Sequence, residues 1–188
     1  KLQNETASTI IISSEDLSGH MPGRHRLHGY GAAPHLMGAM VMAFKTAAPD
    51  DAITFFFTTR TREAWLRSCY VQHLRAARMI WDEADYMKRM KTSADFAAII
   101  DQIKREVPEC EVLTTSLEEH TARPLGIAEA LLDLLALDEK RQAAMVLSAL
   151  RTSALPADIQ AQLLALNRSD LDTAELKKAK RALIEGAT

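Results

Sequence analysis

The sequence contains little cysteine and no long apolar run. Its two cysteines, Cys69 and Cys110, form no CxxC pair and no repeated spacing with histidine, which disfavours a disulfide framework or a zinc module. Apolar runs such as those at 10–12 and 53–57 fall far short of the roughly 20 residues that span a bilayer. We therefore expect no membrane-spanning helix, no bound metal ion and a reducing, cytoplasmic location.

A strong charge of either sign is also absent. The chain has 23 lysines and arginines against 25 aspartates and glutamates, a formal net charge of −2. This balance gives no general attraction to nucleic acids or acidic membranes, so no nucleic-acid partner is expected. Hydrophobic residues make up 47% and charged residues 26% of the 188 positions. That composition favours one compact globular domain, or one with a small appendage.

Three short segments have the composition of buried strands. They lie at 9–14 (TIIISS), at 52–59 (AITFFFTT) and, with a weaker signal, at 110–115 (CEVLTT). Their hydrophobicity is nearly continuous rather than alternating, as in parallel strands that are covered on both faces. We therefore expect the three segments to form a parallel sheet.

Helical spacing of apolar residues separates these strands. It predicts helices at 34–48, 62–78 and 94–107. Whether the second helix continues beyond Trp81 is left open, and Ser93 is the expected N-cap of the third. The alternation of strands and helices predicts an α/β fold with right-handed crossover connections.

An arginine and a serine follow the second expected strand. Arg60 ends that strand, and Ser68 lies eight residues later in the next helix. The carboxyl ends of parallel strands face the crevice in which α/β proteins bind ligands. A guanidinium, a hydroxyl and the amides of a helix N-terminus are suited to hold one phosphate there. The alternative is that Arg60 forms a structural salt bridge and Ser68 faces solvent.

The stretch FFFTTRTREAWLRSCYVQHLR, at 55–75, resembles the 3′-phosphate-binding element of sulfotransferases that use PAPS (3′-phosphoadenosine-5′-phosphosulfate), especially their bacterial members. The shared features are an apolar strand, an arginine at its end, a short turn and a serine eight residues after the arginine. The stretches TIIISSEDLS and EVLTTSLEEH are similar to the strands before and after this element in bacterial relatives. The resemblance implies a P-loop nucleotide-hydrolase type of fold and assigns Arg60 and Ser68 to the 3′-phosphate of the nucleotide.

One element of that family does not occur in this sequence. Family members carry a glycine-rich, lysine-containing loop near the N-terminus that wraps the 5′-phosphosulfate, and the chain has no GxxxxGK-like stretch. The chain also begins at Lys1 rather than at a methionine. We therefore expect the first strand and the phosphate loop to belong to residues upstream of Lys1.

Sulfuryl transfer also needs a base that deprotonates the acceptor. Glu15 follows the first expected strand and would face the same rim as Arg60 if the strands are parallel. It is therefore the first candidate for the base. The alternative is an ordinary carboxylate at the start of a helix, since the sequence SSED around it is typical of a helix cap.

A glycine-rich loop at 19–31 holds most of the remaining candidates. Arg24, His25 and Arg26 are candidate contacts of an anionic acceptor or of the nucleotide, and His28 is a weaker candidate for the base. A solvated loop is the main alternative, and metal binding is the least favoured because no cysteine or helix-borne histidine pair accompanies the loop.

These observations predict an α/β core at 1–126 and a helical part at 127–188 that packs on it. The predicted function is transfer of a sulfuryl group from PAPS to a hydroxyl or amine of a small molecule or carbohydrate, without a metal. The alternative is a non-catalytic α/β protein whose helical tail mediates homo-oligomerisation or partner binding. A nucleotide kinase relative is a third interpretation, which would also need the phosphate loop.

Overall fold

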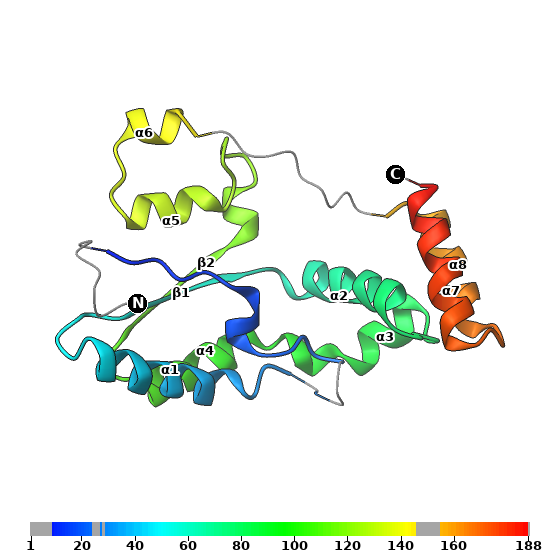
Figure 1. Ribbon diagram of the computed structural model, residues 1–188, viewed down its shortest axis with the longest axis horizontal. Helices are drawn as coiled ribbons and strands as arrows, with labels where there is room; N and C mark the ends of the chain where they lie inside the picture. The colour runs from blue at the N-terminus through cyan, green and yellow to red at the C-terminus, as the bar shows by residue number, and fades with distance from the viewer. Residues whose placement is uncertain (1–8, 24–26, 28, 146–154, 188) are drawn as a thin grey trace. The chain divides into compact units, whose positions relative to one another are not determined.

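The computed structural model describes residues 9–23, 27, 29–145 and 155–187. They form a mixed α/β protein that is mostly helical and has one parallel sheet of two strands (Figure 1). The chain divides into two compact units. The sheet unit comprises Lys1–Arg60 and Thr92–Ala130, and the helical unit comprises Thr61–Lys91 and Leu131–Thr188.

The sheet confirms two of the three expected strands and their parallel pairing. Strand β1 (Thr54–Thr59) pairs with β2 (Glu111–Ser116), and their register runs from Thr54 opposite Glu111 to Thr59 opposite Ser116. The predicted parallel arrangement therefore holds for these two strands. It places the carboxyl ends of both strands at one edge of the sheet.

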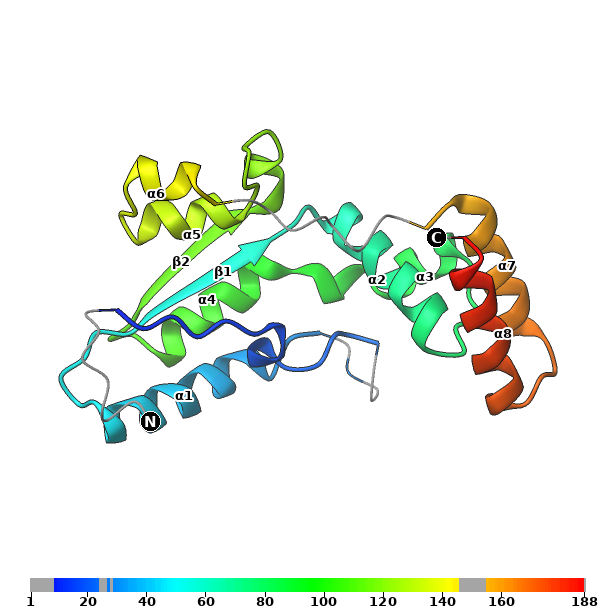
Figure 2. The same ribbon diagram turned by 45° about the horizontal axis from the view of Figure 1, so that its top comes forward.

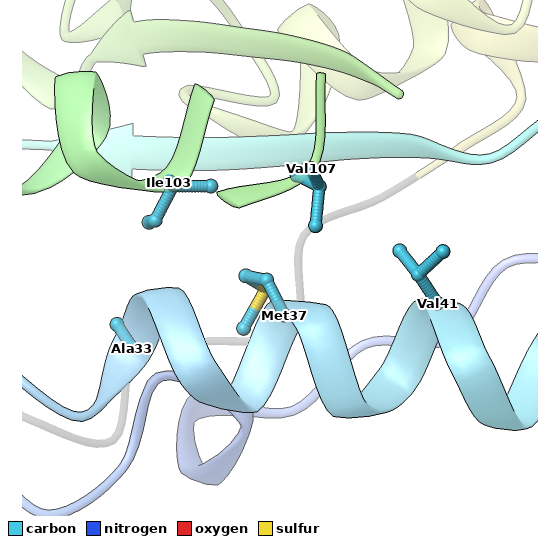
Figure 3. Packing of buried hydrophobic residues seen from close by; sticks show 5 residues of the cluster. All are labelled: Ala33, Met37, Val41, Ile103 and Val107. Atoms are coloured by element: carbon cyan, nitrogen blue, oxygen red, sulfur yellow. The ribbon is translucent and has the colours of Figure 1, made fainter. Parts of the chain in front are cut away.

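Two helices build the core of the sheet unit. Helix α1 (Ala33–Ala47) begins with a proline in its first turn, as the sequence predicted, and packs on α4 (Phe96–Glu106). The buried side chains at this contact are Ala33, Met37, Val41, Ile103 and Val107 (Figure 3). Phe55 and Phe57 of β1 and Val112 of β2 pack against the same cluster. Apolar burial thus fixes the sheet against the helix pair.

The first expected strand, at 9–14, is not a strand in the structure. Ile10, Ile11 and Ile12 are 43%, 51% and 51% exposed, and none of the three belongs to a helix or strand. The segment runs in the same direction as β1 and enters a short 3₁₀ turn, η2 (Glu15–Ser18) (Figures 1 and 2). The prediction of a strand was wrong here because β-branched residues favour strands only where neighbouring strands and buried faces are available.

The helical unit contains most of the other described helices. Its members are α2 (Arg62–Ala76), α3 (Glu83–Arg89), α6 (Glu139–Ala143), α7 (Ala157–Arg168) and α8 (Thr173–Glu185). Helix α5 (Ala128–Leu134) spans the change from the sheet unit to the helical unit. Helices α7 and α8 pack on one another and α7 packs on α2. The predicted helical character of the C-terminal part is confirmed, and its division from the core at residue 127 stays a prediction.

Two helix boundaries differ from those expected. Helix α2 stops at Ala76 because Ala77 adopts an extended conformation, and a new helix, α3, starts with Asp82 as N-cap. Helix α4 starts at Phe96 with the Asp95 side chain as its cap, while Ser93 is buried in a short 3₁₀ turn, η3 (Lys91–Ala94). Aspartate is as good a cap as serine, so the tertiary environment of Ser93 decided between the two.

The end of α2 is fixed by side chains from the C-terminal helices. Lys180 donates hydrogen bonds to the carbonyl oxygens of Leu74 and Ala77, both at 2.7 Å. The Asn167 side chain also donates to Leu74 O, at 3.1 Å. These donors satisfy carbonyls that a helix end leaves without intrahelical partners. Lys180 is only 5% exposed, and its burial, helped by the nearby charge of Arg78, lowers its pKa.

Candidate functional site

The carboxyl ends of β1 and β2 carry a cluster of polar residues. Arg60 follows the last residue of β1, and the 3₁₀ turn η4 (Leu117–His120) follows β2 directly. Parallel pairing brings these two chain segments to the same edge of the sheet. In open α/β sheets this edge is where ligands bind. We refer to Arg60, Glu118 and the η4 turn as the edge cluster.

Arg60 forms an ion pair that lacks a hydrogen bond. Its Nε lies 3.7 Å from Oε1 of Glu118, and the two side chains are 37% and 35% exposed. The Nε atom itself is buried and has no hydrogen-bond partner within the described part of the chain. A buried N–H without a partner is uncommon and costs about 1–3 kcal/mol. The guanidinium is thus charge-paired while one of its donors is not satisfied.

The η4 turn places Glu118 opposite Arg60. Ser116 caps the turn, and the Glu119 carboxylate accepts the Ser116 N–H at 3.4 Å in a capping box. The Ser116 hydroxyl also donates to Oε2 of Glu118 at 3.1 Å. One carboxylate oxygen of Glu118 is therefore held by Ser116 while the other faces Arg60. This local order depends on the Ser-x-x-Glu spacing, which is a known helix-start signature.

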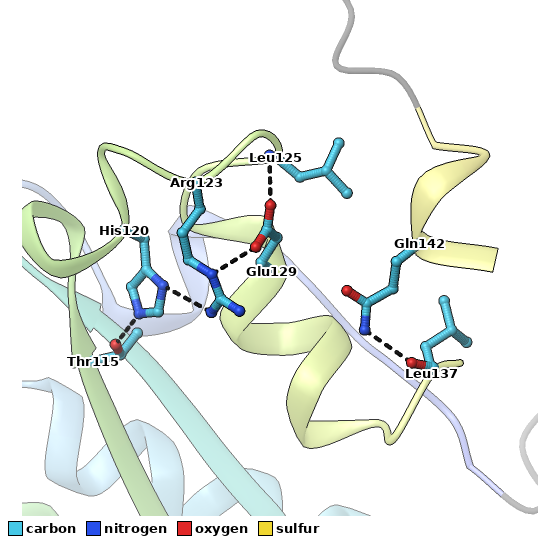
Figure 4. A network of polar contacts seen from close by, with 7 residues as sticks. All are labelled: Thr115, His120, Arg123, Leu125, Glu129, Leu137 and Gln142. Atoms are coloured by element: carbon cyan, nitrogen blue, oxygen red, sulfur yellow. Dashed lines mark hydrogen bonds and ion pairs between the residues drawn. The ribbon is translucent and has the colours of Figure 1, made fainter. Parts of the chain in front are cut away.

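A second chain of contacts extends from η4 into α5 (Figure 4). Nε2 of His120 lies 2.8 Å from Oγ1 of Thr115, and Nδ1 of His120 lies 3.4 Å from a guanidinium nitrogen of Arg123. Because arginine can only donate, Nδ1 is the acceptor and the imidazole proton is on Nε2. Nε2–H then donates to Thr115, whose hydroxyl donates to Glu119 at 3.3 Å. The histidine is held in one tautomer.

The same chain of contacts ends at a buried carboxylate. Glu129 is 8% exposed and accepts hydrogen bonds from Nε of Arg123 at 2.6 Å and from the backbone N–H of Leu125 at 2.8 Å. Both carboxylate oxygens are satisfied, which is the condition under which a buried charge is tolerated. Arg123 and Glu129 therefore stabilise the turn between η4 and α5.

Three of the predicted site residues, Arg60, Ser68 and Glu15, lie within the described part of the chain. Arg60 lies at the end of β1, as expected, and belongs to the sheet unit. Ser68 is exposed on α2 and belongs to the helical unit. Glu15 is exposed at the start of η2, where the Ser14 side chain accepts the Asp16 N–H at 3.2 Å, so the cap around it is present.

The remaining candidates lie in the loop at 19–31. Arg24, His25, Arg26 and His28 lie outside the described residues. Their assignment as acceptor contacts and as a weaker base stays a prediction.

Sequence reasoning did not find Glu118 and His120 as site residues. Glu118 meets Arg60 across 58 positions of the chain, and no periodic spacing marks such a pair. The available signal was the position of both residues directly after an expected strand. That signal indicates nearness to the ligand-binding edge, but it does not show which residue Glu118 contacts.

The two cysteines are free. Cys69 is buried in α2. Burial of the Cys110 thiol, together with the charge of Glu109, raises its pKa. Because the thiolate is the reactive form, the raised pKa of Cys110 disfavours a nucleophilic role for it at neutral pH.

Among the described residues, no group of three or more histidine, cysteine, aspartate or glutamate side chains is arranged to hold a metal ion. No helix within the described ranges is both long and apolar enough to cross a bilayer.

Comparisons of the chain with models of protein families, with curated proteins and with solved structures gave no match. The fold and the edge cluster therefore define a mixed α/β protein with a candidate anion site.

Proposed function

We propose that the protein binds the 3′-phosphate of PAPS through Arg60 and Ser68 and belongs to the sulfotransferase type of P-loop fold. The observation that carries this proposal is the buried Arg60 Nε, which has no hydrogen-bond partner in the described part of the chain, at the carboxyl edge of a parallel sheet. A phosphate oxygen is a suitable acceptor for this donor, because guanidinium and phosphate form short, charge-assisted hydrogen bonds.

The energies of the two interactions favour phosphate over the existing partner. An ion pair whose side chains are about one-third exposed, like Arg60 and Glu118, contributes roughly 0–1 kcal/mol after solvent screening. A hydrogen bond to a charged group contributes about 1.5–3 kcal/mol. A dianionic phosphate ester that reaches Arg60 Nε would therefore gain more than the loss of the Glu118 contact costs.

Ser68 enters the proposal through its position on α2. Its side chain is exposed, so its hydroxyl is available to a ligand. In the proposed complex this hydroxyl donates to the same phosphate as Arg60. The support comes from the resemblance of the stretch at 55–75 to the 3′-phosphate-binding element.

The proposed reaction moves the sulfuryl group to an acceptor hydroxyl or amine. The acceptor oxygen or nitrogen forms a bond to sulfur while the bond between sulfur and the 5′-phosphate oxygen breaks, which leaves adenosine 3′,5′-bisphosphate. The acceptor proton passes to a base, and the exposed carboxylate of Glu15 is the proposed one. In the family this sequence resembles, a glycine-rich loop holds the 5′-phosphosulfate, so Arg60 and Ser68 account for the 3′-phosphate alone.

Titration calorimetry with adenosine 3′,5′-bisphosphate tests the proposal. The matched control ligand is adenosine 5′-monophosphate, which lacks only the 3′-phosphate. We expect the bisphosphate to bind more tightly than the monophosphate, and Arg60→Ala to weaken the bisphosphate by about tenfold or more, because a charge-assisted hydrogen bond is lost.

The matched control variant is Arg105→Ala, which removes the same charge from an exposed position on α4. It should leave binding of the bisphosphate unchanged. Equal affinity for the two nucleotides, or equal binding by the Arg60→Ala variant and the unaltered protein, would overturn the proposal.

A further inference from the structure

The carboxylate of Glu118 occupies the side of Arg60 that the proposed ligand needs. We propose that Glu118 is an internal competitor of the phosphate and sets the affinity of the site. This inference rests on the proposed function, because it concerns the same guanidinium. It adds a residue that reduces binding of the 3′-phosphate rather than contributing to it.

The geometry shows a carboxylate that stands close to Arg60 without satisfying it. The distance of 3.7 Å between Nε and Oε1 is long for a hydrogen bond, although it keeps the two charges together. Nε–H consequently has a charge partner and no acceptor. A phosphate oxygen seated on Nε would bring its negative charge next to the Glu118 carboxylate. Binding of the phosphate therefore requires the Glu118 side chain to turn away, or else it is weakened by repulsion between the two negative charges.

Glu118 is also restrained from turning away. Its second oxygen accepts the Ser116 hydroxyl at 3.1 Å, and its backbone carbonyl accepts the Thr121 hydroxyl at 3.1 Å. Ser116 is at the same time the cap of η4. The turn therefore keeps the carboxylate facing Arg60. Its side chain is 35% exposed, so a path into solvent exists when a stronger anion arrives.

Glu118 and its acidic neighbour Glu119 make different contacts in the same turn. Glu119 accepts from the Ser116 backbone and from Thr115, and so completes the capping box. Replacing Glu119 would disturb the turn, whereas Glu118 makes its charge contact with Arg60. Glu109 offers a cleaner comparison, because it is an exposed glutamate of the sheet unit that lies outside the described helices and strands.

The decisive experiment is a double-mutant cycle measured by calorimetry with adenosine 3′,5′-bisphosphate. Glu118→Gln keeps the shape of the side chain and removes its charge. We expect it to tighten binding by about two- to fivefold, the factor that corresponds to an exposed ion pair. In the Arg60→Ala background the same substitution should tighten binding less, because the part of the gain that comes from freeing Arg60 is lost. Glu109→Gln should leave the affinity unchanged in either background.

The outcomes distinguish this inference from the proposed function. If the protein binds the bisphosphate through Arg60 while Glu118→Gln binds equally or more weakly, the competitor role is overturned and the proposed function stands. If neither the unaltered protein nor Glu118→Gln shows binding that depends on Arg60, the proposed function is overturned and this inference with it. A gain in affinity from Glu118→Gln that is equally large in the Arg60→Ala background would also overturn the competitor role.

Discussion

Two cationic side chains at the ends of secondary-structure elements have very different surroundings. Lys180, in the helical unit, is 5% exposed. It donates one hydrogen bond to Leu74 O in the last turn of α2 and one to Ala77 O, directly after that helix. Arg60, in the sheet unit, is about one-third exposed and has an Nε without a hydrogen bond in the described chain. A cation whose donors are satisfied by the backbone serves the fold. A partly exposed cation that has a buried donor without a hydrogen bond is the better candidate for a ligand site.

The largest effect is expected for Lys180→Met. Methionine keeps much of the side-chain volume and removes both hydrogen bonds of Lys180. Ala77 O then loses its charged donor, and Leu74 O keeps the neutral hydrogen bond from the Asn167 amide. We expect a loss of about 1–3 kcal/mol in the free energy of unfolding, part of the cost being offset by release of the buried charge. Urea denaturation followed by circular dichroism measures it.

Lys178→Met is the control for that substitution, because Lys178 is exposed on the same helix. Its effect should stay within about 0.5 kcal/mol. Equal stability of the two variants would show that Lys180 does not hold the end of α2.

A smaller effect is expected from pH, and its sign follows from the lowered pKa of Lys180. Between that lowered pKa and the ordinary value of 10.5, the unfolded chain binds more protons than the folded one, so stability rises with pH in this window. The neutral amine still has two N–H groups for its two carbonyls. Tyr70 acts in the opposite direction, since burial raises its pKa: its stabilising contribution is fully present below the ordinary value of 10.0 and is lost as the pH rises through the raised pKa.

The Lys180→Met variant isolates the lysine contribution, because Tyr70 is common to both proteins. The stability difference between the unaltered protein and the variant should widen from neutral pH towards pH 10.5. Denaturation curves at several pH values measure this difference. A difference that is constant or that narrows would contradict the lowered pKa.

The smallest effect on stability is expected for Arg60→Ala. Its ion pair is about one-third exposed, so we expect a change within about 0.5 kcal/mol, in contrast to the large loss expected in nucleotide binding. Denaturation of Arg60→Ala beside Arg105→Ala provides the measurement. A loss of about 2 kcal/mol or more would favour the structural salt bridge that the sequence left open.

Local sequence patterns predicted most elements correctly. Strands β1 and β2 were predicted from short apolar runs, and helix α1 from the periodic spacing of its apolar residues. The helical character of the C-terminal part was predicted as well. The run at 9–14 shows the limit of that reasoning. Three isoleucines in a row carry a strong β preference, yet they lie exposed and outside the sheet, because strand formation needs a partner.

The candidate site was predictable only in part. Arg60 was found because the end of a strand is a local feature. Glu118 was not, because its relation to Arg60 depends on how β1 and β2 pair. The sequence also left open whether the helix at 62–78 continues, and the structure ends α2 at Ala76. This boundary depends on contacts made to the end of α2 by Lys180 and Asn167, which are distant in sequence.

The sequence by itself determined the mixed α/β class, the parallel pairing of its two strands and the position of an arginine at a strand end. These features follow from short-range periodicity and from the direction of the chain. Only the tertiary structure decided which cation is satisfied and which is left with an unmet donor. That distinction depends on a contact between Arg60 and Glu118 across 58 positions and on one between Lys180 and the Leu74 carbonyl across 106. The sequence carries no periodic signal over such separations.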